Sequence, residues 1–253
     1  MIVVAGFLGA GKTTLIEGIL KAPKLSKRVA VIQNEFSPQM GLESSLMKDS
    51  EGDDIEDFYE MPNGCICCAA KDDLIQTLDS LLEKNAKSGK PKLEYILVET
   101  NGLADPCQVV QTFWLDDELC SKVALHSCVS LIDAREFPKK LDSTLKRQEE
   151  SKQNLGQVST TDSEFPENEL LLRQLVFADK ILINKVDLLS SGKERDEALA
   201  TVRAAIARVN TEADIQETEH SKVDIDYLLG EIKQRTNVEA LKSSEYMAET
   251  HKL

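Results

Sequence analysis

Short apolar runs alternate with longer amphipathic stretches along most of this chain. Each run holds four to six residues, is rich in Val and Ile and contains few polar residues. Such runs are typical of strands buried on both faces of a parallel sheet. The predicted strands are residues 2–5, 28–33, 95–98, 129–132 and 180–183, and the predicted helices are 12–21, 71–84, 167–177 and 193–209. The alternation predicts an α/β fold, with a mainly parallel sheet and helices on both of its faces.

Two polar segments interrupt this pattern. Residues 49–60 hold seven carboxylates in twelve positions, and we expect a solvated loop that leads into a strand. Residues 142–168 are rich in Ser, Thr, Gln, Lys and Glu, which predicts a flexible insertion. After Leu229 the chain turns polar and shows no further strand–helix cycle. We therefore expect one domain over residues 1–230, with an insertion at about 142–168, and a C-terminal tail over 231–253.

Length and charge narrow the class of protein. A chain of 253 residues, 42% of them hydrophobic, can bury a substantial core. Its formal net charge of −14 argues against nucleic acid or an anionic membrane as the main partner. No apolar run approaches the ~20 residues that span a bilayer. The apolar stretch at residues 1–5 is too short for a signal peptide. We expect a cytoplasmic protein, in which clustered cysteines bind metal or act in catalysis more often than they form disulfides.

Residues 6–13 read GFLGAGKT and match the phosphate-binding pattern GxxxxGK[ST]. They stand between a predicted strand and a predicted helix, which argues against an ordinary glycine-rich turn. In this motif backbone N–H groups surround the phosphates, the lysine reaches the β and γ oxygens, and the hydroxyl reaches Mg²⁺. Lys12 is therefore a predicted catalytic residue and Thr13 a predicted Mg²⁺ ligand. The predicted nucleotide contacts here are Gly6, Gly9, Ala10, Gly11, Lys12, Thr13 and Thr14.

Residues 184–187 read NKVD and directly follow a predicted strand. In P-loop GTPases this motif reads guanine, because its aspartate accepts two N–H groups and adenine lacks the exocyclic donor. We expect Asn184, Lys185 and Asp187 to lie at the carboxyl end of the sheet, where α/β proteins bind ligands. The motif predicts GTP as the nucleotide, and it has no role in a small-molecule kinase that shares the phosphate loop.

Carboxylates follow two further predicted strands. Glu99 comes directly after 95–98 and is placed to hold Mg²⁺ through water or to orient an attacking water. Capping of the next helix is the alternative role for Glu99. Glu35 follows the strand that ends at residue 33 and is a second candidate beside the Mg²⁺. Gly102 is predicted to donate its N–H to the γ-phosphate.

Cys65, Cys67 and Cys68 form a CxCC cluster after a Pro-Asn-Gly turn. Neighbouring cysteines make a poor disulfide, because their Cα atoms are held ~3.8 Å apart. Three thiolates fill three corners of a tetrahedral Zn²⁺ site and leave one position for exchange. Cu(I) and Co²⁺ fit the same donors, and small buried residues in a core turn are the alternative. The other cysteines are scattered and predicted to be core residues: Cys107, Cys120 and Cys128.

Taken in this order, the motifs resemble the CobW-related P-loop GTPases, a family of metal chaperones and metallocentre activators. The resemblance spans about residues 1–230. It rests further on 34–36 (NEF), 63–68 (NGCICC), 102–106 (GLADP), Gln174 and 178–179 (AD). Residues 42–46 (LESSL) and 113–119 (FWLDDEL) are similar to the eukaryotic zinc-regulated GTPase metalloprotein activators.

The resemblance implies a Mg²⁺-dependent GTPase that hydrolyses GTP to GDP and phosphate. It further implies delivery of zinc from the CxCC site to client metalloproteins such as a methionine aminopeptidase, and a nucleotide-dependent homodimer. By family position, Lys71 is expected to sense the nucleotide and Asn210 to lie in a base-contacting loop. The family's C-terminal domain is expected to be absent after Leu253.

Two other functions stay open. Asn101 stands where the family usually has Ser or Thr, which keeps open a nucleotide-gated module that binds metal or a partner with little hydrolysis. Cobalt handling, as in cobalamin synthesis, is the other.

Overall fold

A single parallel sheet organises the protein. The computed structural model describes residues 1–23, 27–33, 58–60, 70–107, 109–110, 121–141 and 167–230. Its seven strands lie in the order β3-β2-β4-β1-β5-β6-β7, and every neighbouring pair is parallel. The strands are β1 (Ile2–Gly6), β2 (Val29–Gln33), β3 (Phe58–Glu60), β4 (Tyr95–Glu99), β5 (Ser127–Asp133), β6 (Lys180–Asn184) and β7 (Asp214–Glu217). The predicted α/β class is confirmed.

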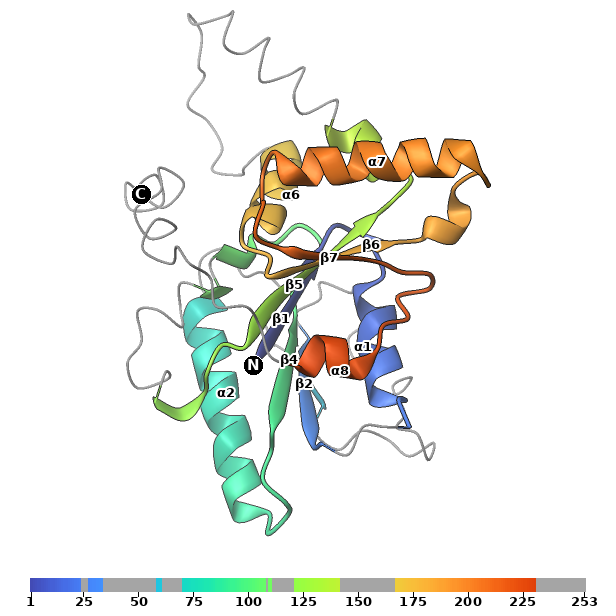
Figure 1. Ribbon diagram of the computed structural model, residues 1–253. Coiled ribbons are helices and arrows are strands. Elements are labelled where there is room, and N and C mark those ends of the chain that lie inside the picture. The colour runs from blue at the N-terminus through green and yellow to red at the C-terminus, as the bar shows by residue number, and fades with distance from the viewer. Residues whose placement is uncertain are drawn as a thin grey trace, which may run out of the picture.

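Helices cover both faces of this sheet (Figure 1). They are α1 (Lys12–Leu20), α2 (Ala70–Lys87), α6 (Glu167–Val176), α7 (Lys193–Ala207) and α8 (Ile225–Leu229). One apolar cluster joins α1 and α8 to one face through alternate strand residues such as Val4 and Leu131. Two other clusters pack α2, α6 and α7 against the opposite face. Burial on both faces accounts for the nearly continuous apolar runs of the central strands.

The two edge strands, β3 and β7, were not predicted from the sequence. Residues Asp214–Glu217 form β7 although they read DIQE, and none of them is fully buried. At the other edge, Phe58–Glu60 forms the three-residue β3, which lies within residues 49–60, the segment that was expected to be a loop leading into a strand. β7 is partly exposed to solvent, so its residues do not form an apolar run that a sequence pattern could reveal. The predicted insertion over 142–166 and the tail over 231–253 lie outside the described residues.

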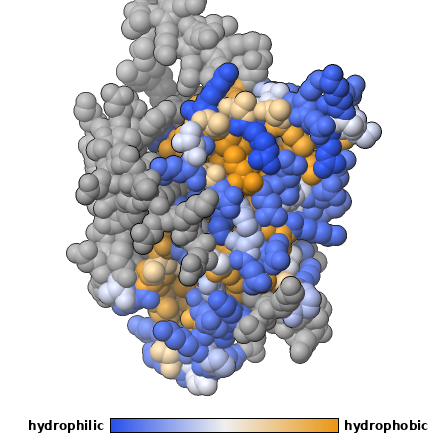
Figure 2. Space-filling model, in the orientation of Figure 1, coloured by the Kyte–Doolittle hydropathy of each residue, from blue (hydrophilic) through white to orange (hydrophobic). Residues whose placement is uncertain are grey.

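Hydrophilic residues cover most of the coloured surface in Figure 2, and apolar residues gather there only in small patches. Within the described ranges, the structure has no helix with the length and apolarity needed to cross a membrane.

A buried ion pair ties α6 to the segment that follows β4. Arg173 Nη1 lies 3.1 Å from Asp105 Oδ2, and the two side chains are only 1% and 4% exposed. The next residue, Gln174, donates its amide to the carbonyl oxygens of Gly102 and Ala104, each at 3.1 Å. Residues 102–105 are therefore held by side chains about 70 positions away in the sequence.

Replacing Arg173 with methionine is expected to lower the free energy of unfolding by about 3–5 kcal/mol, because Asp105 keeps a buried charge without this partner. Urea denaturation measures the loss. The double variant Arg173→Met/Asp105→Asn is expected to lose less, since both charges are removed together. A loss below about 1 kcal/mol in the single variant would show that the pair contributes little.

Candidate nucleotide site

The phosphate loop connects β1 to α1 and bends sharply at its glycines. Gly11 has φ +106°, and a Cβ on it would lie 2.5 Å from both Asn184 Nδ2 and Ser221 Oγ. A Cβ on Gly6 would lie 2.4 Å from the carbonyl oxygen of Leu131. Only glycine fits these two positions. The loop therefore brings its backbone against the ends of β5 and β6 and leads into the N-terminus of α1, a favourable place for an anion.

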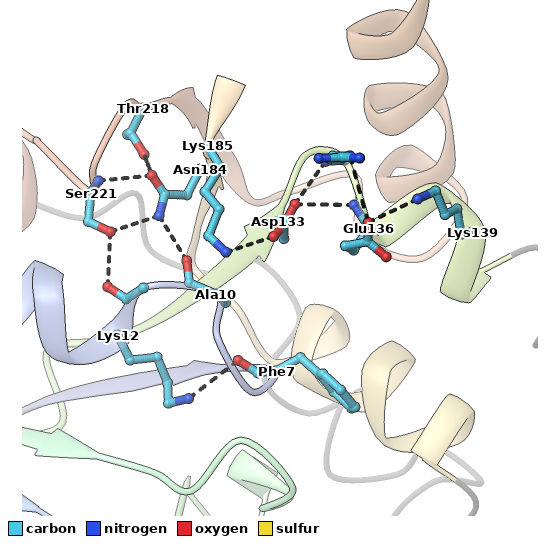
Figure 3. A network of polar contacts seen from close by, with 12 residues as sticks. Phe7, Ala10, Lys12, Asp133, Glu136, Lys139, Asn184, Lys185, Thr218 and Ser221 are labelled. Atoms are coloured by element: carbon cyan, nitrogen blue, oxygen red, sulfur yellow. Dashed lines mark hydrogen bonds and ion pairs between the residues drawn. The ribbon is translucent and has the colours of Figure 1, made fainter. Parts of the chain in front are cut away.

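Lys12 is 8% exposed and lies back along this loop. Its Nζ donates to the carbonyl oxygens of Gly6 at 3.0 Å and Phe7 at 3.4 Å; Figure 3 shows the second contact. The loop thus carries a buried ammonium group whose charge suits phosphate oxygens.

Thr13 and Glu99 meet at the carboxyl ends of β1 and β4. Thr13 Oγ1 donates to Glu99 Oε1 at 2.8 Å, and Glu99 is 3% exposed. A hydroxyl and a carboxylate are hard oxygen donors, which Mg²⁺ prefers. The donor set thus fits Mg²⁺, and Glu99 contacts the phosphate loop. Gly102 also lies against the loop, since a Cβ on it would meet the backbone N of Leu8 at 2.5 Å.

Asn184 joins the NKVD loop to the phosphate loop (Figure 3). Its Nδ2 donates to the carbonyl oxygen of Ala10 and to Ser221 Oγ, both at 2.8 Å. Its Oδ1 accepts from Thr218 Oγ1 at 3.0 Å and from the Ser221 N–H at 2.9 Å. Asn184 is 2% exposed, so its amide is used inside the protein. The structure brings the predicted phosphate and base motifs together through this one side chain.

Lys185 is positioned by an ion pair with the end of β5. Its Nζ lies 2.8 Å from Asp133 Oδ2, and Lys185 has φ +62°. Burial would raise the pKa of the Asp133 carboxyl, but hydrogen bonds from Lys185 and from the Glu136 and Arg135 amides lower that pKa below its ordinary value. Asp133 therefore stays ionised at neutral pH and holds the lysine in place.

Residues 218–221 belong to the same edge of the sheet but were not predicted. Ser221 Oγ donates to the carbonyl oxygen of Gly11 at 2.9 Å, while Thr218 contacts Asn184. His220 Nε2 lies 3.8 Å from Asp187 Oδ2. The signal was weak because this loop follows the polar edge strand β7. Two non-glycine residues of this loop, His220 and Ser221, have positive φ. This backbone conformation cannot be recognised from the sequence.

The structure does not bring Asn210 to this edge. Its Nδ2 donates to the carbonyl oxygens of Leu175 and Ala178 at 2.8 and 2.9 Å, and its Oδ1 accepts from the N–H of Ala213. These groups lie before the start of β6, whereas Asn184 lies at its end. Asn210 therefore holds the turn between α7 and β7, and the base-contacting position expected from the resemblance is wrong in this geometry.

Five predicted site residues have side chains outside the part of the chain that the structure describes. Glu35, Cys65, Cys67 and Cys68 lie outside the described residues, as does the Lys71 side chain, although its backbone belongs to α2. Within the described ranges there is no group of three or more His, Cys, Asp or Glu side chains that could hold a metal ion.

A glycine-rich phosphate loop, a Thr–Glu pair and an Asn-Lys-x-Asp loop on one edge of a parallel sheet define a P-loop nucleotide-binding protein. The profile of the CobW/HypB/UreG nucleotide-binding domain matches residues 1–217, and the chain belongs to this family. The predicted resemblance is confirmed.

Relatives of known name are similar over most of this chain. It is 37% identical over 223 residues to the zinc-regulated GTPase metalloprotein activator 1 of Schizosaccharomyces pombe, covering 88% of this chain and 46% of that protein. It is 33% identical to the zinc chaperone CobW of Pseudomonas aeruginosa, with coverages of 90% and 58%. The chain spans about half the length of the curated relatives it matches.

Solved structures share the fold. The Zn(II)-bound YjiA GTPase from E. coli superposes with a TM-score of 0.55 at 23% identity, over 88% of this chain and 58% of that one. HypB from Helicobacter pylori in complex with nickel gives 0.53 at 13% identity, over 87% and 79%.

Proposed function

We propose that this chain is the GTP-binding and GTP-hydrolysing part of a zinc chaperone. The observation that carries this proposal is the bond from Asn184 to Ala10, which fastens the guanine-selecting motif to the phosphate loop. A nucleotide that spans both motifs would place its base beside Asp187 and its phosphates beside Lys12. Lys185, held by Asp133, and the backbone of Gly9, Ala10 and Thr14 complete the proposed contacts.

Hydrolysis of GTP to GDP and phosphate is the proposed reaction. Thr13 and Glu99 would hold Mg²⁺, with Glu35 as a further carboxylate, and the ion would neutralise charge on the β- and γ-phosphates. Lys12 would bind the transferred phosphoryl group, and the Gly102 N–H would contact the γ-phosphate. These groups supply positioning and electrostatic stabilisation, which phosphoryl transfer chiefly requires.

Zinc is the proposed cargo. Cys65, Cys67 and Cys68 supply three thiolates and leave one tetrahedral position for exchange with a client. Similar proteins carry the names zinc-regulated GTPase metalloprotein activator and zinc chaperone, which favours zinc over cobalt. A client metalloprotein such as a methionine aminopeptidase, a cytoplasmic location and a nucleotide-dependent homodimer complete the proposal.

The nucleotide is proposed to control zinc affinity. The cysteines lie along the chain between Glu35 and Glu99, so contacts with the γ-phosphate would alter the segment that carries the thiols. We expect zinc affinity, measured by competition with a chelator, to differ at least about fivefold between the GDP-bound and GTP-bound protein, a modest coupling free energy. Cys67→Ala should lose bound zinc in both states, and Cys128→Ala, a buried cysteine on β5, should keep it.

Equal zinc affinity in both nucleotide states would contradict the coupling.

The rate of GTP turnover distinguishes a hydrolase from a binding module. We expect phosphate release to fall at least about tenfold in Glu99→Ala, by the loss of a charged ligand. A wild-type protein that binds GTP but releases no phosphate, with or without Zn²⁺, would be a nucleotide-gated binding module instead.

A further inference from the structure

Gln33 is a buried polar residue at the end of β2 to which the proposed function gives no role. It is 3% exposed and is the register partner of Glu99 in the neighbouring strand β4. Its Nε2 donates to Glu99 Oε2 at 2.8 Å. The same carboxylate accepts from Thr13 through its other oxygen, Oε1, at 2.8 Å. One carboxylate therefore receives a donor on each oxygen, from the first turn of α1 and from the end of β2.

The chemistry of this contact allows one arrangement only. An ionised carboxylate accepts hydrogen bonds and cannot donate them, so Gln33 must present its NH₂ group to Glu99. Because each oxygen accepts a hydrogen bond, the plane of the carboxylate is defined. The Thr13 hydroxyl donates its one hydrogen bond to Glu99, and its oxygen lone pairs stay available for a cation. The position of the Thr13 oxygen thus depends on the orientation of Glu99, and that orientation depends on Gln33.

Burial makes the contact costly to lose. Removing a donor from a buried charged group leaves that group poorly solvated, and the side chain turns to find another partner. If Glu99 turned, the Thr13–Glu99 pair would no longer hold its two oxygens on one site. Preorganised ligands of this kind bind a metal more tightly than the same ligands free to rotate.

We propose that Gln33 is a positioning residue for the magnesium site, because its amide fixes the Glu99 carboxylate in the orientation that Mg²⁺ requires. This inference rests on the proposed function, in which Thr13 and Glu99 hold Mg²⁺. Gln33 acts through Glu99 and itself touches neither nucleotide nor metal.

The test measures GDP binding calorimetrically over a series of MgCl₂ concentrations and in EDTA. Gln33→Met keeps the length and burial of the side chain and removes the amide. Mg²⁺ is expected to increase the affinity for GDP, and the Mg²⁺ concentration that gives half of this increase is the quantity compared. We expect Gln33→Met to raise that concentration about tenfold, in line with a lost hydrogen bond to a charged group. The affinity for GDP in EDTA should stay unchanged. The matched control is Gln216→Met, the same change on a half-buried residue of β7, which should behave as wild type.

A double-mutant cycle separates positioning from general structural damage. In a Glu99→Gln background, Gln33→Met should have no further effect on the Mg²⁺ dependence. An equal tenfold shift in both backgrounds, or a loss of GDP affinity in EDTA as large as that in Mg²⁺, would overturn the positioning role. If Mg²⁺ increases the affinity for GDP in the wild type and in Gln33→Met at the same Mg²⁺ concentration, this inference fails and the proposed function stands. If Mg²⁺ has no effect on wild type, the proposed function fails as well.

Discussion

Lys12→Ala is expected to abolish nucleotide binding at micromolar protein concentrations. Lys12 is 8% exposed, and its ammonium group donates to the carbonyl oxygens of Gly6 and Phe7 in the loop. Phosphate oxygens that enter the loop would gain a buried cation at once, without the cost of ordering a flexible side chain. Two charge-assisted hydrogen bonds of about 1.5–3 kcal/mol each correspond to an affinity loss of at least about 100-fold.

Calorimetric titration with GDP and with GTP measures this effect. Lys21→Ala is the control, because Lys21 follows the same helix but pairs with Glu17 at the surface, where its side chain is 47% exposed. The control should bind both nucleotides as wild type does. Unchanged GTP affinity in Lys12→Ala would show that residues 6–13 are not a phosphate site.

Asp187→Asn is expected to replace guanine selectivity by a preference for xanthine. Guanine offers two N–H donors to the carboxylate, whereas the amide of asparagine presents a donor of its own to that edge. Xanthine carries an oxygen where guanine carries the exocyclic amine, so it can accept from the new amide. The asparagine oxygen can still accept one guanine N–H, but the second hydrogen bond to a charged group is lost, which predicts a fall of at least about tenfold in GTP affinity.

Competition among GTP, XTP and ATP measures the selectivity. Asp196→Asn makes the same chemical change on the exposed first turn of α7 and should leave the order of affinities unchanged. Retained guanine preference in Asp187→Asn would remove Asp187 from the base-reading role. The contact between Asp187 and His220 would then be its main interaction among the described residues.

The central strands could be predicted because they are buried on both faces, so almost every residue in them is apolar. β7 could not, since it is partly exposed and its residues, DIQE, are as polar as those of a loop. β3 has only three residues, too few to show a pattern. The structure adds these two strands at opposite edges of the same sheet. β7 matters most, because it delivers the loop of residues 218–221 to Asn184 and Gly11.

The candidate site divides in the same way. The phosphate loop and the NKVD loop are contiguous motifs, so their residues could be named from the sequence. Asn210 shows the opposite case: a position taken from family order lies at the start of β6, and its amide holds a turn. Sequence order alone does not tell which end of a strand a residue meets.

The sequence by itself determined the alternation of strands and helices, the two nucleotide motifs and the cysteine cluster. Local backbone geometry accounts for this, because glycines with positive φ and a strand–loop–helix order define such motifs within a few residues. The tertiary structure decided which distant residues support them. Thr13 and Gln33 reach Glu99 across 86 and 66 positions, and Ser221 reaches Gly11 across 210. These contacts depend on the register of parallel strands, which only the packed sheet sets.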